Sequence, residues 1–349
     1  MILIDTQKEE FSKLRDIRVF GRISHDDRFN GNLLVIGLGG IGSRTVCNLK
    51  GMMVDDITPE DNIHFLMVDS DIPEMEQTIE DSKEHIGFNA LEVLSIYRPN
   101  IENILADGIK KNPVHPNLAN WMDADFPDVT VTKDGAHGNR QIGRLMFSNA
   151  YEDIRMLLFD RLEEIHDKAN GNWMDVIIVS SLSGGTGSGI LSDLAYNIRA
   201  YGKAKKWANL RIGGCLLMPD VIFGNKSVTQ DPELMFRMMA NGCAALKEVD
   251  YYMKLSEKDD AYIFESTTHK MVIRENLFDA CMLVSGKKDS QGYLPEGTIL
   301  MDTASFLYKL ACNKYIGNND VNDDRKLLRD VFFDCLLYTS PSPRDVEES

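Results

Sequence analysis

The amino-acid sequence predicts an α/β fold in which a doubly wound, mostly parallel sheet is covered by helices on both faces. Short runs of consecutive apolar residues recur along the chain, as expected for strands buried on both faces. Longer segments with apolar residues three and four apart lie between these runs, and this alternation is typical of parallel sheets. Two of the runs also end in glycine-rich turns that lead directly into a helical pattern.

Five apolar runs are the predicted strands. They read NLLVIG, IHFLMVD, VIIVSSL, IGGCLLM and ACMLVS, at residues 32–37, 63–69, 176–182, 212–218 and 280–285. The predicted helices, whose apolar residues repeat with helical spacing, cover 44–50, 145–168, 188–200, 234–254 and 298–311. Two largely polar stretches, 56–61 and 256–275, are expected to lie outside the core.

The composition excludes several classes of partner. The 38 basic and 54 acidic residues give a net charge of −16, whereas surfaces that bind nucleic acid need an excess of lysine and arginine. No apolar run approaches the roughly 18 residues of a membrane span. The six cysteines are scattered singly, and none has zinc-ligand spacing with a histidine. We therefore expect a cytoplasmic protein with reduced thiols, no metal site built from its own side chains, no membrane insertion and no direct contact with nucleic acid.

The first glycine-rich turn, GLGGIGS at residues 37–43, follows the first predicted strand and opens a helix. Glycines allow a tight turn there, and they let backbone N–H groups approach phosphate oxygens at the positive end of a helix dipole. Asp69 closes the second strand, where a carboxylate would bind the ribose in a dinucleotide fold. The candidate ligand-binding residues of the turn are Gly39, Gly40, Ile41 and Gly42.

A second turn of the same type, SGGTGSG at residues 183–189, follows the third predicted strand. It contains only Gly, Ser and Thr, so consecutive backbone N–H groups and hydroxyls can cradle an anion. Two such turns can hold a di- or triphosphate from two sides, whereas a dinucleotide fold needs one. A side chain at Gly185 or Gly187 is expected to fill the space of the phosphate. The candidate residues are Gly184, Gly185, Thr186, Gly187 and Ser188.

SGGTGSG matches the tubulin/FtsZ signature [S/A/G]-G-G-T-G-[S/A]-G at every position. Three other segments stand in the order of that family. GLGGIGS occupies the place of its first nucleotide loop, VDSD at 68–71 the place of its second, and GAHGNRQIGR at 135–144 the place of its third. The chain therefore resembles the tubulin/FtsZ superfamily over roughly residues 31–313, and it looks closest to the bacterial tubulin-like proteins.

The resemblance implies a protein that binds GTP or GDP and polymerises head to tail into homo-oligomers or filaments. It implies that the phosphates lie on the backbone of the two glycine turns. Gly138 and Asn139 would meet the γ-phosphate, Arg140 would neutralise charge there, Pro219 would lie in a loop at the ribose, and Asn241 would contact the base or ribose. Mg²⁺ is expected as well, because a triphosphate carries more charge than the visible cations offset.

Hydrolysis in this family depends on acidic residues that a neighbouring subunit supplies. NNDVND at residues 318–323 matches NxDxxD, the FtsZ form of that loop, and makes Asp320 and Asp323 the candidate catalytic residues, acting in trans. The stretch fails as a calcium loop, because Arg325 stands where the sharp turn needs glycine. An ordinary turn has the same composition, so a family member that binds nucleotide without turnover is an alternative.

The resemblance and the composition divide the chain into four parts. Residues 1–30 form an N-terminal extension, 31–316 the predicted GTP-binding domain, and 317–334 the start of a linker or second domain. Residues 335–349 turn abruptly Ser/Pro-rich, and YTSPSPRD resembles translated adapter sequence. We expect this last part to be a non-native or disordered tail, and the natural protein to continue after about residue 334.

Two enzyme classes are further alternatives. An NAD(P)-dependent Rossmann oxidoreductase would use the first turn and Asp69, but it leaves SGGTGSG unexplained. A ThiF-like adenylating enzyme needs an acidic-Asn-Arg-Gln cluster soon after its second strand, whereas the Asn-Arg-Gln of this chain, at 139–141, lies far from VDSD. Selective binding of GTP, NAD or ATP separates these hypotheses.

Overall fold

The computed structural model describes residues 32–54, 57, 62–82, 86–123, 133–225, 229–287 and 292–312, together with 315–316, 326–327, 329 and 332–333. Its centre is a six-stranded sheet with the order β3-β2-β1-β4-β5-β8, in which every neighbouring pair is parallel. The strands are β1 (Asn32–Leu38), β2 (Ile63–Asp69), β3 (Val93–Ser95), β4 (Met174–Ser181), β5 (Leu210–Leu217) and β8 (Ala280–Val284).

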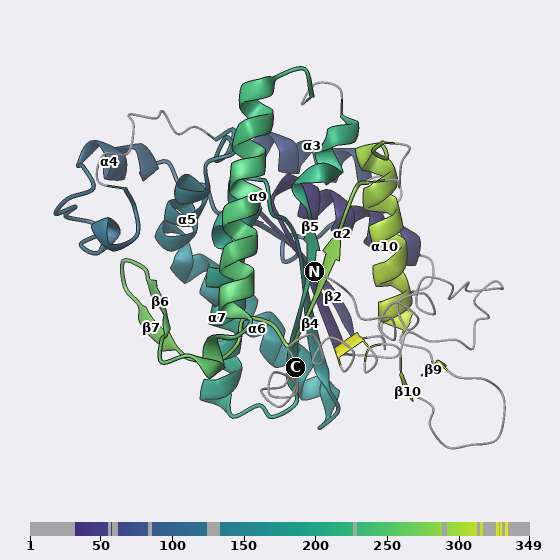
Figure 1. Ribbon diagram of the computed structural model, residues 1–349. Coiled ribbons are helices and arrows are strands. Elements are labelled where there is room, and N and C mark those ends of the chain that lie inside the picture. The colour runs from purple at the N-terminus through teal and green to yellow at the C-terminus, as the bar shows by residue number, and fades with distance from the viewer. Residues whose placement is uncertain are drawn as a thin grey trace, which may run out of the picture.

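Helices cover both faces of this sheet (Figure 1). Side chains alternate along β1, so that Leu34 and Ile36 belong to one core and Leu33 and Val35 to the other. The first core packs under α5 (Arg140–Asn149), α6 (Tyr151–Ala169), α7 (Thr186–Lys205) and α9 (Pro232–Tyr252). The second packs under α2 (Gly39–Met53), α3 (Ile72–Ser82) and α10 (Glu296–Cys312). The predicted α/β fold class is confirmed.

The five predicted strands are present, each within two residues of its expected bounds. The single helix predicted over 145–168 is wrong, because the chain leaves helical geometry at Ala150 (φ −92°, ψ 7°) and forms α5 and α6 instead. The apolar stripe continues across this break, which is why periodicity alone did not reveal it. The other four predicted helices all begin earlier than expected. Since α2 begins at Gly39 and α7 at Thr186, much of each glycine turn belongs to a helix.

The polar stretch 256–275 was expected to lie outside the core. Part of it is instead buried. It contains an antiparallel hairpin of β6 (Tyr262–Glu265) and β7 (Lys270–Ile273), preceded by η3 (Leu255–Glu257). Tyr262 and Phe264 are buried in the larger core. The apolar runs of these strands, YIF and MVI, are only three residues long and stand among polar residues, so composition did not reveal the half-buried hairpin.

The remaining described elements are short. They are α4 (Ile101–Ala106), η1 (Leu118–Asn120), η2 (Pro219–Gly224), and the two-residue strands β9 (Tyr315–Ile316) and β10 (Lys326–Leu327), which pair antiparallel. No helix among the described residues is both long and apolar enough to cross a bilayer. No disulfide joins any two of the five cysteines in the described part of the chain.

Candidate functional site

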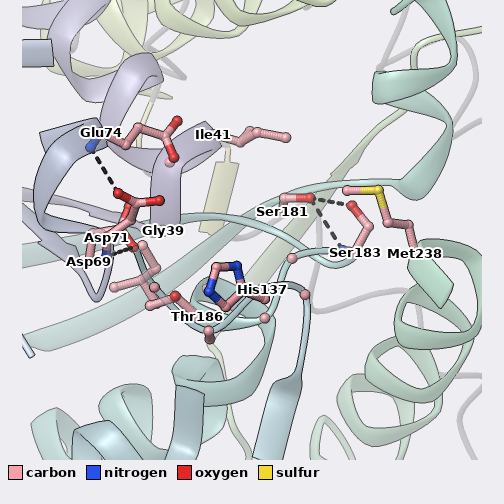
Figure 2. A pocket seen from close by; sticks show the side chains of 18 of the residues that line it. Gly39, Ile41, Asp69, Asp71, Glu74, His137, Ser181, Ser183, Thr186 and Met238 are labelled. Atoms are coloured by element: carbon pink, nitrogen blue, oxygen red, sulfur yellow. Dashed lines mark hydrogen bonds between the residues drawn. The ribbon is translucent and has the colours of Figure 1, made fainter. Parts of the chain in front are cut away.

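A cavity of about 310 Å³ opens at the carboxyl ends of β1, β2 and β4. It lies where the chain winds from β1 toward β2 on one side and from β4 toward β5 on the other, the switch point at which open α/β sheets bind ligands. Figure 2 shows Asp69, Asp71 and Glu74 together on one side of the cavity, and Ser181, Ser183 and Met238 on the opposite side.

Two helices begin at this cavity. α2 starts at Gly39 (φ +68°) directly after β1, and α7 starts at Thr186, five residues after Ser181, the last residue of β4. The two starts are in contact, since a Cβ at Gly39 would lie 3.0 Å from the Gly187 nitrogen. The N–H groups of the first turn of a helix have no acceptor within it and lie at the positive end of its dipole. The cavity therefore presents two sets of backbone donors to one ligand.

The glycines of the two turns serve different purposes. A Cβ at Gly187 would lie 2.6 Å from the Leu38 carbonyl oxygen, and one at Gly185 would lie 2.7 Å from the Asn139 nitrogen. Both glycines therefore permit close packing of backbone on backbone. We expected a side chain at Gly185 or Gly187 to fill the space of the phosphate. This reason is wrong, because a Cβ at either position would first collide with the protein backbone. At Gly184, by contrast, a Cβ meets nothing within 4 Å.

The loop before α5 forms the floor between these helix starts. Gly135, His137 and Gly138 all have positive φ, which is rare for a residue such as histidine and marks a constrained backbone. Asn139 ends the loop and caps α5, its side-chain oxygen accepting from the N–H groups of Gln141 and Ile142.

α9 ties two of the loops together. The Asn241 amide donates to the carbonyl oxygen of Gly138 (2.7 Å) and to that of Ser183 (2.9 Å). A third connection runs between β2 and α7, where the hydroxyls of Ser70 and Thr186 are 2.5 Å apart. The three cavity loops are thus held by side chains from elements far apart in the sequence.

The cavity wall is strongly acidic. One arginine, Arg44, faces it, and this guanidinium is 2.8 Å from Glu296 and 3.6 Å from Glu74. The carboxylates of the wall are Asp69, Asp71, Glu74, Asp134 and Glu296. An anionic ligand therefore needs either the backbone donors of α2 and α7 or a cation of its own.

Asp69 is the most perturbed group of this wall. Its Oδ1 accepts from the N–H groups of Ser70 (2.7 Å) and Asp71 (3.3 Å), whereas its Oδ2 is buried without a hydrogen-bond partner among the described residues. Burial raises the pKa of Asp69 to about 7, despite the opposing backbone hydrogen bonds. A cation or a hydroxyl of a ligand would satisfy the second oxygen.

A family model described as "Tubulin like" matches residues 34–314. This chain belongs to the tubulin-like family. The match spans the sheet, its covering helices and every loop of the cavity described above, and no curated protein matches the chain.

Three solved structures illustrate the similarity of the tubulin-like chain to other proteins. CetZ2 from Haloferax volcanii is 13% identical with a TM-score of 0.41, over 80% of this chain and 58% of its own. TubZ from Bacillus thuringiensis serovar israelensis is 13% identical with a TM-score of 0.48, over 86% and 62%. TubZ of Clostridium botulinum phage c-st is 12% identical with a TM-score of 0.42, over 84% and 63%. The chain thus spans less than two thirds of the length of these proteins.

The predicted site residues fall into two groups in the tubulin-like chain. The residues that line the cavity are Gly39, Gly40, Ile41, Asp69, Gly138, Gly184, Gly185, Thr186 and Gly187. The residues that do not line it are Gly42, Asn139, Arg140, Ser188, Pro219 and Asn241. Asp320 and Asp323 lie outside the described residues.

Most of the predicted site residues that do not line the cavity make packing or hydrogen-bond contacts that stabilise the surrounding elements. Gly42 lets α2 approach β4, since a Cβ there would lie 2.5 Å from the Val179 carbonyl oxygen. Pro219 packs against α9, 1.9 Å from the Cβ that Gly242 lacks. Arg140 points away from the cavity, toward Ser188 and Glu248.

Some lining residues were not predicted from the sequence. Arg44 and Glu74 follow the first turn and VDSD closely, so the rule that sites form just beyond strand ends would have found them. Ile222, Met238 and Glu296 come from η2, α9 and α10, which only the tertiary fold brings to the cavity.

Proposed function

We propose that this tubulin-like chain binds GTP or GDP in the cavity at the carboxyl edge of the sheet. The observation that supports this most strongly is the convergence of the N-termini of α2 and α7 on one cavity. Their first-turn N–H groups and dipoles favour a chain of phosphates held from two sides. The choice of guanine as the base comes from the family.

We propose that Mg²⁺ accompanies the nucleotide. The described residues contain no cluster of three or more His, Cys, Asp or Glu side chains arranged to hold a metal ion. Mg²⁺ commonly keeps several waters and binds through phosphates and one or two carboxylates. The unpartnered Oδ2 of Asp69 and the neighbouring Asp71 fit that second role. The ion would reduce the electrostatic repulsion between the phosphates and the carboxylates of the cavity wall.

Self-assembly and hydrolysis are proposed for the whole protein. The tubulin-like chain would assemble head to tail in the cytoplasm, with no direct contact to nucleic acid or membrane. Asp320 and Asp323 of one subunit would complete the site of the next and position the attacking water. The acidic stretch in the sequence and the family membership support this proposal.

Competition binding tests the proposal. A fluorescent GTP analogue is bound to the full chain with Mg²⁺ and displaced by GTP, ATP or NAD. We expect GTP to displace it selectively, and chelation of Mg²⁺ with EDTA to weaken binding at least tenfold. Selective displacement by NAD would make the first turn a dinucleotide site and overturn the assignment. If the folded chain bound none of the three nucleotides, it would be a family member that has lost the ability to bind nucleotide.

A further inference from the structure

A second cavity, of about 210 Å³, is lined by other residues than the cavity at the carboxyl edge of the sheet, which we call the nucleotide cavity. Its walls come from α5, α7, α9 and the β6–β7 hairpin, which gather on one face of the sheet in Figure 1. We call it the Trp121 cavity, after the indole in its wall. Its wall includes Arg140 and Gly189, each two residues beyond Gly138 and Gly187 of the first cavity. It is therefore a separate space built on the same elements.

Several of the residues that line this cavity carry hydrogen-bond donors. The Trp121 indole Nε1 is buried and has no hydrogen-bond partner among the described residues. An indole N–H can only donate, and leaving it unpaired in the interior is unfavourable. The Arg140 and Arg144 guanidiniums and the Ser192 hydroxyl line the same space. A ligand that fits this wall must supply acceptor oxygens.

The two arginines differ in how firmly their charge is paired. Arg144 is 2.9 Å from Asp193, a carboxylate whose side chain is 1% exposed and which also accepts from the Tyr262 hydroxyl. Separating Arg144 from Asp193 would leave a buried charge without a counter-ion, which is strongly unfavourable. Arg140 is held by Ser188, its Nε 2.7 Å from the hydroxyl oxygen, and pairs with Glu248.

Glu248 is a counter-ion that can be exchanged. Its side chain is 43% exposed, whereas that of Arg140 is 17% exposed. Moving Glu248 into water costs little, because ion pairs at the surface contribute little. Arg140 would then keep its place through Ser188 and present a guanidinium to a ligand carboxylate, which it can bind with two parallel hydrogen bonds.

The other walls of the cavity are largely aromatic. The rings of Tyr252 and Tyr262 lie edge to face, with centroids 5.0 Å apart, and both line the space together with Trp121. Arg144 lies 4.8 Å above the Trp121 ring and holds it in place. Such walls suit a planar ring. We propose that the Trp121 cavity binds a small aromatic carboxylate, whose carboxylate replaces Glu248 on Arg140.

Benzoate is the probe for this proposal. The chain has three tryptophans, so the Trp173→Phe/Trp207→Phe variant leaves Trp121 as the single tryptophan, which is excited at wavelengths that tyrosine does not absorb. Benzoate, benzamide and acetate are titrated at constant ionic strength without nucleotide. Calorimetry on the unsubstituted chain provides an independent reading. We expect a saturable response to benzoate, a much weaker one to acetate and none to uncharged benzamide over the same range.

Two variants should move the affinity in opposite directions. Arg140→Gln should weaken benzoate binding by about 10- to 100-fold, the usual effect of losing hydrogen bonds to a charged group. Glu248→Gln should strengthen it several-fold, because the competing carboxylate is gone. Circular dichroism checks that both variants are folded.

Three results would overturn the proposal: no saturable signal by fluorescence or calorimetry, equal binding of benzamide, or indifference to Arg140→Gln. The first would mean that only water fills the cavity. Since no nucleotide is present in the assay, failure of GTP binding would not alter any of these outcomes.

Discussion

Asp69 shows how one buried oxygen can link pH to stability. Burial raises the pKa of its carboxyl from 3.8 to about 7 in the folded chain. The folded state therefore holds this proton more tightly than the unfolded state does. Between about pH 4 and pH 7 the stability falls as the pH rises, and above pH 7 the full cost of the buried charge is present.

Asp69→Asn should therefore stabilise the chain, free of nucleotide and metal, more at pH 8 than at pH 5. The asparagine oxygen can keep the bonds from the Ser70 and Asp71 N–H groups, while the amide replaces the unpartnered oxygen. Each pKa unit is worth about 1.4 kcal/mol, so the gain in unfolding free energy should grow by about 2 kcal/mol across this range. Urea denaturation at the two pH values measures it. Asp250→Asn, whose carboxylate is 80% exposed, is the control, and equal pH profiles for the two variants would contradict the argument.

Gly184 is the position at which the ligand space can be tested without disturbing the fold. A Cβ there meets nothing within 4 Å, and the residue lines the nucleotide cavity. Gly184→Val should leave the unfolding midpoint nearly unchanged and weaken binding of the GTP analogue by at least tenfold, because the isopropyl group competes with the ligand. Thermal denaturation and fluorescence titration measure the two effects.

Gly297→Ala provides the matched control, since a Cβ at Gly297 also meets nothing within 4 Å and the residue does not line the cavity. Wild-type affinity in a folded Gly184→Val chain would show that the ligand lies elsewhere.

At the scale of elements, α9 acts on the nucleotide cavity mainly through Asn241. Its amide holds the Gly138 and Ser183 carbonyl oxygens, one from each of two loops that carry lining glycines. Asn241→Ala removes both bonds, and we expect a loss of about 1–2 kcal/mol in unfolding free energy. The looser loops should also lower GTP affinity several-fold. Lys247→Ala, on an exposed part of α9, is the control. An unchanged affinity for the Asn241→Ala chain would restrict α9 to a purely structural role.

The fold was largely predictable from the sequence because buried parallel strands leave continuous apolar runs. β3 was missed, since its three residues are too short for a pattern. The two glycine turns were recognised by composition, but the sequence could not separate Gly184, which faces open space, from Gly187, which packs on backbone. Met238 and Glu296 reach the cavity only through tertiary packing, and no local signal marks them.

At the scale of the whole molecule, β4 runs from the nucleotide cavity to the opposite edge of the sheet. Ser181 at its carboxyl end lines the nucleotide cavity. Asp175 at its amino end is 1% exposed and lies 2.7 Å from Arg211 and 3.0 Å from Arg329. Arg329 stands six residues after Asp323 in the sequence. Arg329 is thus anchored at the edge opposite the cavity, which is consistent with the proposed head-to-tail contact in trans.

This arrangement predicts that hydrolysis depends on assembly. If the acids of one subunit complete the site of the next, GTP turnover by the wild-type chain should rise more steeply than in proportion to protein concentration. Asp320→Asn/Asp323→Asn should bind GTP with wild-type affinity and lose at least tenfold in turnover, because the attacking water is no longer positioned. Phosphate release measured over a concentration series tests both statements.

Asp324→Asn, an adjacent acid outside the NxDxxD pattern, is the matched control and should keep its turnover. A second variant distinguishes action in trans from action within one subunit. Gly184→Val chains, which should not hold GTP, still carry both acids and should restore turnover when mixed with Asp320→Asn/Asp323→Asn chains. Turnover proportional to concentration, or no recovery in the mixture although each chain is folded and the mixture assembles, would mean that the acids do not act across a subunit contact.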